Sequence, residues 1–275
     1  MIPSAVYKIF FSATGTTERV VDAVADGIAS VIDTAPVRKY DFTLPKARLS
    51  FPTLRPDELV IFGVPTYAGR VPNVLLKYLD TINGNGAFAV PVVTFGNRAF
   101  DNSLIELRNI LENKGFRTIA AAAFSCEHSF SLSLGAGRPD ADDFAFAAKF
   151  SSLLLEKMKN IDIESYSHSP ISVDGDACAG YFQPTTDEGK AIDIRKVKPK
   201  TSDKCDNCAL CANLCPMGSI SPDNCSSITG ICIKCGACIK KCPKGAKYFD
   251  DADFLFHKCQ IERDYQRRAQ NKLFV

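Results

Sequence analysis

No apolar run in this chain of 275 residues approaches the ~18–20 residues that a membrane span needs. The first residues also lack the charged segment and apolar stretch of a signal peptide. A formal net charge of only +2 gives no reason to expect a nucleic-acid partner. Together with the twelve cysteines, these absences predict a protein of the reducing cytoplasm, where thiols persist.

Cysteine is missing from the first 125 residues, whereas eleven of the twelve cysteines lie from Cys178 to Cys259. This change of composition indicates a domain boundary. Between about Asn160 and Lys200 the hydrophobic period is lost while Ser, Pro, Gly and Asp accumulate, which predicts an irregular connector packed along one domain. We therefore expect a first domain over 1–160, a connector over 161–200, a second domain over 201–250 and a C-terminal helical extension over 251–275.

Eight cysteines form two copies of one pattern, Cys-x2-Cys-x2-Cys-x3-Cys-Pro, over residues 205–216 and 232–243. In this pattern three cysteines wrap one iron–sulfur cluster, and the fourth crosses to the cluster of the other copy. Disulfides or zinc are the alternatives, but zinc needs one set of four ligands at wider separation, and no secretory route is visible. The pattern therefore predicts two [4Fe–4S] clusters, one on Cys205, Cys208, Cys211 and Cys242 and the other on Cys232, Cys235, Cys238 and Cys215.

Four cysteines fall outside the two copies and share no spacing, so we interpret each as a buried or free thiol: Cys126, Cys178, Cys225 and Cys259. The second copy is rich in lysine, which could steer an acidic redox partner or form a solvated face: Lys234, Lys240, Lys241, Lys244 and Lys247. Further cations are expected on the exposed face of the C-terminal helix: Arg263, Arg267, Arg268 and Lys272.

Before residue 160, short apolar runs alternate with helical patterns. The runs predict strands over 5–11, 37–40, 58–63, 88–95 and 118–125, and the helical patterns cover 20–31, 72–79, 102–113 and 140–159. Five strands that alternate with helices favour an α/β fold with an open, doubly wound parallel sheet. Ligands of such sheets bind beyond the carboxyl ends of the strands.

The loop after the first predicted strand reads Ser12-Ala13-Thr14-Gly15-Thr16-Thr17 and leads into a helix. Backbone N–H groups at a helix N-terminus carry partial positive charge, and the hydroxyls add neutral donors. The loop has no lysine to balance a triphosphate, and neither Walker A nor Gly-x-Gly-x-x-Gly occurs there. The pattern favours a single phosphomonoester, with an ordinary capped helix as the alternative.

Two further strand ends, 63–72 and 95–101, carry glycine for close backbone approach and an aromatic residue for stacking. With the phosphate loop, they resemble the flavodoxin family over residues 1–160. The resemblance implies FMN and a five-stranded sheet of order 2-1-3-4-5. It also implies a phosphate site of Ser12, Thr14, Gly15, Thr16 and Thr17, and a ring site of Thr66, Tyr67, Ala68, Gly96, Asn97, Phe100 and Asp101. Tryptophan, a frequent flavin-stacking residue in that family, is absent from this chain.

Residues 201–250 resemble the bacterial two-cluster ferredoxins, which implies a small α+β domain. The order of the two domains resembles a family of flavodoxin–ferredoxin fusion proteins found mainly in anaerobes, and the resemblance covers nearly the whole chain. It implies electron transfer without an established substrate. Our leading hypothesis is an electron conduit between the clusters and FMN that serves a redox partner protein or a small-molecule acceptor.

Two other functions stay open at this stage. An FMN-dependent reductase of a quinone, nitro compound or oxygen species would use Glu127 and His128, which follow the fifth predicted strand. That histidine could equally be a loop residue satisfied by local backbone groups. The third hypothesis is a non-catalytic redox sensor whose clusters serve structure.

Overall fold

The computed structural model describes residues 1–32, 35–163 and 165–275. Five parallel strands form its main sheet in the order β2-β1-β3-β4-β6: β1 (Val6–Phe10), β2 (Val37–Asp41), β3 (Leu59–Pro65), β4 (Phe88–Phe95) and β6 (Ala121–Ser125). The two-residue β5 (Arg117–Thr118) pairs with the start of β4. This order is the flavodoxin-like 2-1-3-4-5 arrangement, so the predicted fold class is confirmed.

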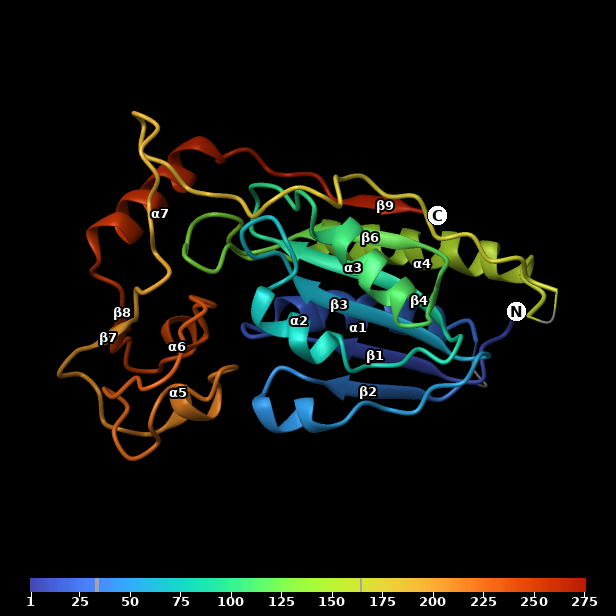
Figure 1. The fold of residues 1–275 in the computed structure, drawn as a ribbon, viewed down its shortest axis with the longest axis horizontal. Helices are drawn as coiled ribbons and strands as arrows, with labels where there is room; N and C mark the ends of the chain where they lie inside the picture. Colours follow the sequence, from blue (N-terminus) through green and yellow to red (C-terminus); the bar gives the residue numbers. More distant parts are fainter. Residues whose placement is uncertain (33–34, 164) are drawn as a thin grey trace.

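Helices cover both faces of the sheet, and a separate hydrophobic core lies under each face (Figure 1). On one face lie α1 (Thr16–Ala29) and α4 (Ala141–Lys159), and on the other lie α2 (Asn73–Leu79) and α3 (Ser103–Asn113). A short 3-10 helix, η1 (Pro45–Leu49), follows β2. Central strand β4 is buried along its whole length, which explains its uninterrupted apolar sequence. No helix among the described residues is long and apolar enough to cross a membrane.

The second lobe (residues 201–250) lies beyond the carboxyl ends of the strands, at the left of Figure 1. It holds two short helices, α5 (Leu210–Asn213) and α6 (Ala237–Lys240), one in each copy of the cysteine pattern. The two copies are joined at their outer ends by an antiparallel pair, β7 (Lys200–Thr201) with β8 (Lys247–Tyr248). The lobe is therefore a small α+β unit built on an internal repeat.

In its described residues, the connector (161–163 and 165–200) has no helix or strand before β7, and it packs along the sheet domain. His168 Nε2 lies 2.8 Å from Glu112 Oε2 on α3. Farther along, the Phe182 N–H donates to the Ala68 carbonyl at 2.8 Å, in the loop after β3. The first contact is at the amino edge of the sheet and the second at the carboxyl edge, so the connector runs from one edge to the other, toward the place where ligands are expected.

The C-terminal extension differs from the single helix that we expected. Its helix α7 (Ala252–Asp264) begins at the capping residue Asp251, and the chain then returns to the sheet as β9 (Lys272–Phe274), antiparallel to β6. Three of the cations assigned to the helix therefore follow it: Arg267, Arg268 and Lys272. The reason is that β6 would otherwise be an open edge, and β9 covers its unpaired backbone groups.

Candidate cofactor sites at the carboxyl edge of the sheet

The loop between β1 and α1 presents a helix N-terminus to the carboxyl edge. Gly15, with φ of 97°, occupies the left-handed region just before the helix, where a side chain would be strained. Two of the hydroxyls predicted to hold phosphate have partners in the protein. The Glu18 N–H donates to Ser12 Oγ at 3.0 Å, and Thr17 Oγ1 lies 2.8 Å from Thr94 Oγ1 in the core.

Ser12 accepts the Glu18 N–H and keeps its own O–H to donate. Among the described residues, the Thr14 and Thr16 hydroxyls have only each other as partners. Both line a small cavity at the helix N-terminus, the loop cavity, and their Oγ1 atoms are 3.5 Å apart. The loop cavity is also lined by Thr66, Gly96 and His128, from the loops after β3, β4 and β6. The helix dipole and two hydroxyls therefore coincide at the loop cavity, which is the arrangement that the predicted phosphate site requires.

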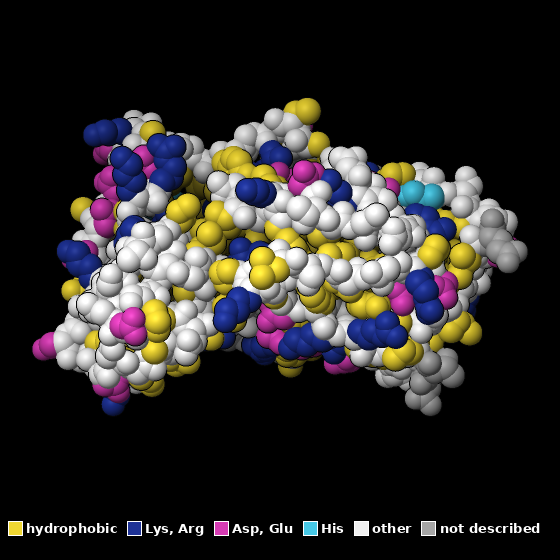
Figure 2. Space-filling model, turned by 60° about the horizontal axis from the view of Figure 1, so that its bottom comes forward, with side chains coloured by type: hydrophobic (Ala, Val, Ile, Leu, Met, Phe, Trp, Pro, Cys, Tyr) yellow, Lys and Arg dark blue, Asp and Glu magenta, His cyan; other side chains and the backbone are white. Residues whose placement is uncertain are grey.

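A larger cavity of about 630 Å³, the central cavity, lies beside the loop cavity. This volume falls within the ~300–1,000 Å³ typical of small-molecule sites. Four of the predicted ring-binding residues line it: Thr66, Tyr67, Ala68 and Gly96. Figure 2 shows hydrophobic side chains gathered where the surface is hollowed between the two lobes, as expected for a site that takes a planar ring.

The remaining three predicted ring-binding residues have other contacts. Asn97 is only 4% exposed; its Nδ2 donates to the carbonyls of Tyr265 and Arg267 at 2.7 and 2.8 Å, and its Oδ1 accepts from the Ala269 N–H at 3.0 Å. Its side chain therefore holds the segment between α7 and β9.

Phe100 and Asp101 also face neighbouring side chains. The Phe100 ring packs on that of Phe95 at 5.7 Å between centroids, and Asp101 pairs with the Arg98 guanidinium. Arg98 and Ala99 are the residues of this loop that line the central cavity beyond Gly96. The loop after β4 therefore lines the central cavity through Gly96, Arg98 and Ala99, and not through the other three side chains that the resemblance placed there.

Some walls of the central cavity come from outside the sheet domain and were not predicted from the sequence. The connector contributes Tyr181, Phe182 and the stretch 192–195, the second lobe contributes 231–234, and α7 contributes His257 and Ile261. Arg98 stacks on Phe182 at 4.1 Å from the ring centroid, which fixes the connector over the cavity. The connector has no periodic pattern, so no sequence signal could place these side chains.

His128 lies where the loop cavity and the central cavity meet. Its Nδ1 accepts the Phe130 N–H at 3.1 Å, so the neutral ring carries its proton on Nε2. Burial, followed by the charges of His257 and Lys240, lowers the pKa of His128 to about 3. The ring is thus a neutral hydrogen-bond donor at ordinary pH. Gly96 permits this packing, since a Cβ there would lie 2.4 Å from His128 Cδ2.

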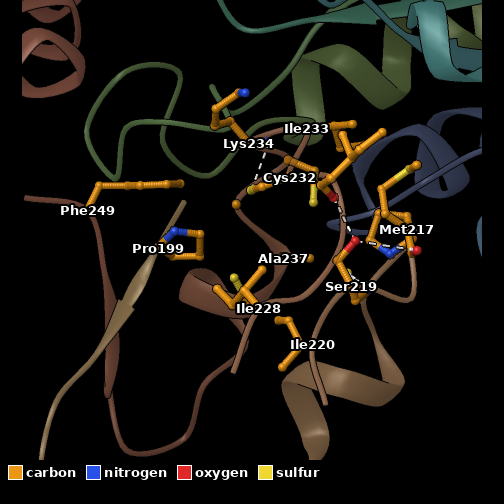
Figure 3. A pocket seen from close by; sticks show the side chains of 16 residues that line it. Pro199, Met217, Ser219, Ile220, Ile228, Cys232, Ile233, Lys234, Ala237 and Phe249 are labelled. Carbon is orange, nitrogen blue, oxygen red and sulfur yellow. Dashed lines mark hydrogen bonds between the residues drawn. The ribbon is translucent and has the colours of Figure 1, made fainter. Parts of the chain in front are cut away.

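The eight cysteines of the repeated pattern line two further cavities. The first cysteine cavity is lined by Cys205, Cys208, Cys211 and Cys242, and the second by Cys215, Cys232, Cys235 and Cys238. Each set takes three cysteines from one copy and one from the other, as the crossed pattern predicted. Apolar side chains from the lobe complete the second cavity, including Met217, Ile220, Ile228 and Phe249 (Figure 3).

The second cysteine cavity shares walls with the sheet domain's cavities. Cys232 also lines the central cavity, and Cys235 also lines the loop cavity. Gly236 makes this approach possible, because a Cβ at that position would lie 2.4 Å from the Ser129 carbonyl oxygen. The structure therefore places the second cysteine cavity, and not the first, against the site expected to hold the flavin.

The four cysteines outside the pattern are dispersed. Cys126 is buried at the end of β6, and burial holds the pKa of its thiol well above the usual range. Cys178 and Cys259 are exposed. Cys225 is buried and lines the first cysteine cavity as a fifth thiol. Its position shows that spacing alone did not reveal every cysteine near the cluster sites.

Comparisons with known proteins agree with this division of the chain. Residues 202–218 and 229–245 match a family model described as a 4Fe–4S binding domain, and each segment contains one copy of the cysteine pattern. A search of the curated proteins found no match. The chain thus joins a 4Fe–4S binding domain to a sheet of flavodoxin-like order, which supports an iron–sulfur flavoprotein in electron transfer.

Several solved flavodoxin structures are similar to the chain. A flavodoxin from the domain Archaea is 14% identical with a TM-score of 0.40, covering 57% of this chain and 99% of its own. The flavodoxin of Streptococcus pneumonia TIGR4 is 20% identical with a TM-score of 0.39, covering 56% and 99%. Flavodoxin 1 from Bacillus cereus is 18% identical with a TM-score of 0.38, covering 58% and 100%.

Proposed function

We propose that the protein binds two [4Fe–4S] clusters and one FMN and carries electrons between them. The single observation that supports this most strongly is the sorting of eight cysteines into two cavities of four. Thiolates are the soft ligands that iron–sulfur clusters require, so the donor chemistry fits the group. Cys205, Cys208, Cys211 and Cys242 would hold one cluster, and Cys215, Cys232, Cys235 and Cys238 the other.

The residues of the sheet domain fit FMN. Thr14, Gly15 and Thr16 would bind the phosphate through hydroxyl and backbone N–H donors, while Ser12 and Thr17 shape the loop. Thr66, Tyr67, Ala68 and Gly96 would flank the ring in the central cavity, together with Arg98 and Ala99. When bound, the clusters exchange single electrons and the flavin exchanges one or two.

The wall shared by the second cysteine cavity and the flavin site supports transfer within one molecule. Cys232 and Cys235 belong to both, and the ion pair between Lys240 and Glu127 fixes the lobe against the loop after β6. Apolar side chains surround the second cysteine cavity. The chain's own contribution is therefore to hold the two sites at one constant separation.

Composition is the first test of this proposal. Protein kept anaerobic is expected to contain close to eight iron, eight sulfide and one FMN per chain. Cys215→Ala is expected to damage the cluster built on the second copy, because Cys215 lines the second cysteine cavity. Cys259→Ser, at an exposed site, is the matched control and is expected to keep full iron content. Zinc without sulfide, or loss of the other cluster in Cys215→Ala, would contradict the assignment.

Kinetics are the second test. In the intact chain, flavin reduction by a low-potential donor that enters through the clusters is expected to proceed at a rate independent of protein concentration. Stopped-flow measurements over a tenfold range of concentration decide this. A rate proportional to protein concentration would mean transfer between molecules and would contradict the conduit.

A reductase is the second candidate, and the central cavity is the observation that favours it. The neutral Nε2–H of His128 lies at this cavity and could donate to a small acceptor above the ring, such as a quinone, nitro compound or oxygen species. Steady-state reduction of these acceptors by the holoprotein tests this function. Flavin reduction that is uncoupled from cluster reduction would instead favour a redox sensor.

A further inference from the structure

Lys247 on β8 is a buried cation without a carboxylate partner. The residue is 3% exposed, and its Nζ donates to Thr201 Oγ1 at 2.7 Å and to the Cys225 carbonyl. Within the described ranges, no Asp or Glu pairs with this ammonium, whereas other lysines of the lobe, such as Lys240 and Lys244, do have such partners. A buried ammonium costs several kcal/mol unless an anion lies close to it.

The place of Lys247 in the repeat identifies the anion. Lys247 lines the first cysteine cavity beside Cys211 and Cys242. Thiolates and the iron–sulfur core they carry are net negative, which makes them the counterion that the buried lysine otherwise lacks.

The equivalent position in the other copy carries no charge. Ile220 follows Cys215 at the same interval as Lys247 follows Cys242, and it lines the second cysteine cavity (Figure 3). The repeat thus delivers one residue into each cavity, a lysine into the first and an isoleucine into the second. The second cavity does have a lysine on its wall, Lys234, but that side chain is only half-buried and its Nζ donates to the exposed Arg195 carbonyl. The two sites therefore differ in that only the first has a fully buried ammonium.

We propose that Lys247 is a fixed countercharge that gives the cluster in the first cysteine cavity a more positive reduction potential than the cluster in the second. This inference rests on the proposed two-cluster function. Reduction adds one electron to a cluster, and a nearby buried cation stabilises the added negative charge, because cluster potentials depend on local charge and exposure. Lys247 would act through its electrostatic field at the cluster and would not be a ligand of the iron.

The proposal assigns the two clusters different roles. The second cysteine cavity shares walls with the flavin site, and the first lies on the far side of the lobe's repeat. An electron in the lobe would therefore rest on the cluster farther from the flavin. The cluster adjoining the flavin would be the less readily reduced member of the pair.

An anaerobic redox titration of the holoprotein, followed by EPR, tests this assignment. Wild type is expected to show two cluster potentials, and Lys247→Met and Lys247→Gln are expected to lower the more positive one by more than the other. Lys247→Arg keeps the charge and is expected to restore the gap. Lys241→Met, which removes an exposed lysine from the same motif, is the matched control and is expected to leave both potentials unchanged.

Iron and sulfide content, measured on the same samples, separates failure of this inference from failure of the proposed function. Fewer than two clusters in wild type would sink the proposed function. Two clusters whose potentials do not change in either neutral variant would overturn the role of Lys247. If both neutral variants lose one cluster while Lys247→Arg keeps it, the countercharge is supported. Loss in all three variants would show that side-chain shape matters rather than charge.

Discussion

Lys240 Nζ on α6 lies 3.1 Å from Glu127 Oε2 in the loop after β6, which joins the second lobe to the sheet domain by a partly buried ion pair. The lysine side chain is 11% exposed and the carboxylate 35%. Exposed pairs contribute at most about 1 kcal/mol, and partial burial increases the cost of losing one partner. The ion pair joins the same two segments as the close approach of Gly236 to Ser129, so both contacts hold α6 against the loop after β6.

The first prediction concerns this ion pair. Glu127→Gln and Lys240→Met are each expected to lower the stability of the holoprotein by about 0.5–1.5 kcal/mol, and the double variant by less than the sum. Urea unfolding of the four proteins measures the coupling. Lys244→Met, whose partner Asp206 lies within the lobe, is the matched control and is expected to show no coupling to Glu127→Gln. Strictly additive effects of Glu127→Gln and Lys240→Met would contradict the pair.

The second prediction concerns the phosphate loop. Thr14→Ala and Thr16→Ala are each expected to weaken FMN binding by about 1.5–3 kcal/mol, roughly 10- to 150-fold in Kd, because each removes a hydroxyl donor to a charged phosphate. Fluorescence titration of the apoflavin protein measures this change. Thr81→Ala removes a hydroxyl bound to the Tyr78 carbonyl at the end of α2, and is expected to leave the Kd unaltered. Native protein with FAD, or unchanged affinity in both loop variants, would refute the assignment.

The third prediction concerns Asn97, which the resemblance placed at the flavin. Asn97→Gly keeps the left-handed backbone, φ of 60°, without strain, but removes the partner of the buried Ala269 N–H and of two part-buried carbonyls of the C-terminal segment. We expect a loss of about 2–3 kcal/mol in unfolding free energy. Asn85→Gly, at another position of positive φ, is expected to change stability by only a few tenths of a kcal/mol. Weakened FMN binding without a stability loss would restore the flavin role.

The fourth prediction follows from the lowered pKa of His128. The unfolded chain protonates this histidine near pH 6.5, whereas the folded chain does so only at about 3. Between these values the unfolded state binds the extra proton, so stability is expected to fall as the pH decreases below 6.5. His128→Gln removes this titrating group, so the slope of the unfolding free energy against pH is expected to decrease by up to about 1.4 kcal/mol per pH unit, which corresponds to one proton. Parallel profiles for wild type and variant between pH 4 and 6.5 would contradict the shift.

The parallel sheet could be predicted because its strands are continuous apolar runs buried on both faces, such as Phe88–Phe95. Strand β9 could not, since Lys272–Phe274 is too short for any period. Its pairing depends on Asn97 and Arg138, which bind the backbone before it from distant parts of the chain. Contacts between residues so far apart in the chain cannot be predicted from the local sequence around β9.

The cysteine sets could likewise be predicted, because thiolate spacing is a local property of tight loops. Which hydroxyls of the predicted phosphate loop have partners within the protein could not be predicted. Ser12 and Thr17 look equivalent to Thr14 and Thr16 in sequence. In the fold, however, Ser12 accepts a hydrogen bond from the Glu18 N–H and Thr17 bonds to Thr94. The walls from the connector also escaped prediction, because Tyr181 and Phe182 are placed by Arg70 and Arg98 rather than by any pattern of their own.

Strand β9 makes the second lobe an insertion within the sheet domain, since the chain leaves after α4 and comes back beside β6. The lobe therefore has two covalent attachments, one through residues 161–200 and one through residues 251–271. A lobe attached at one end only could move away from the sheet domain, whereas attachment at both ends keeps the lobe against the carboxyl edge of the sheet. One proteolytic nick in the connector would accordingly leave the lobe in place, and only a second cut beyond α7 would free it.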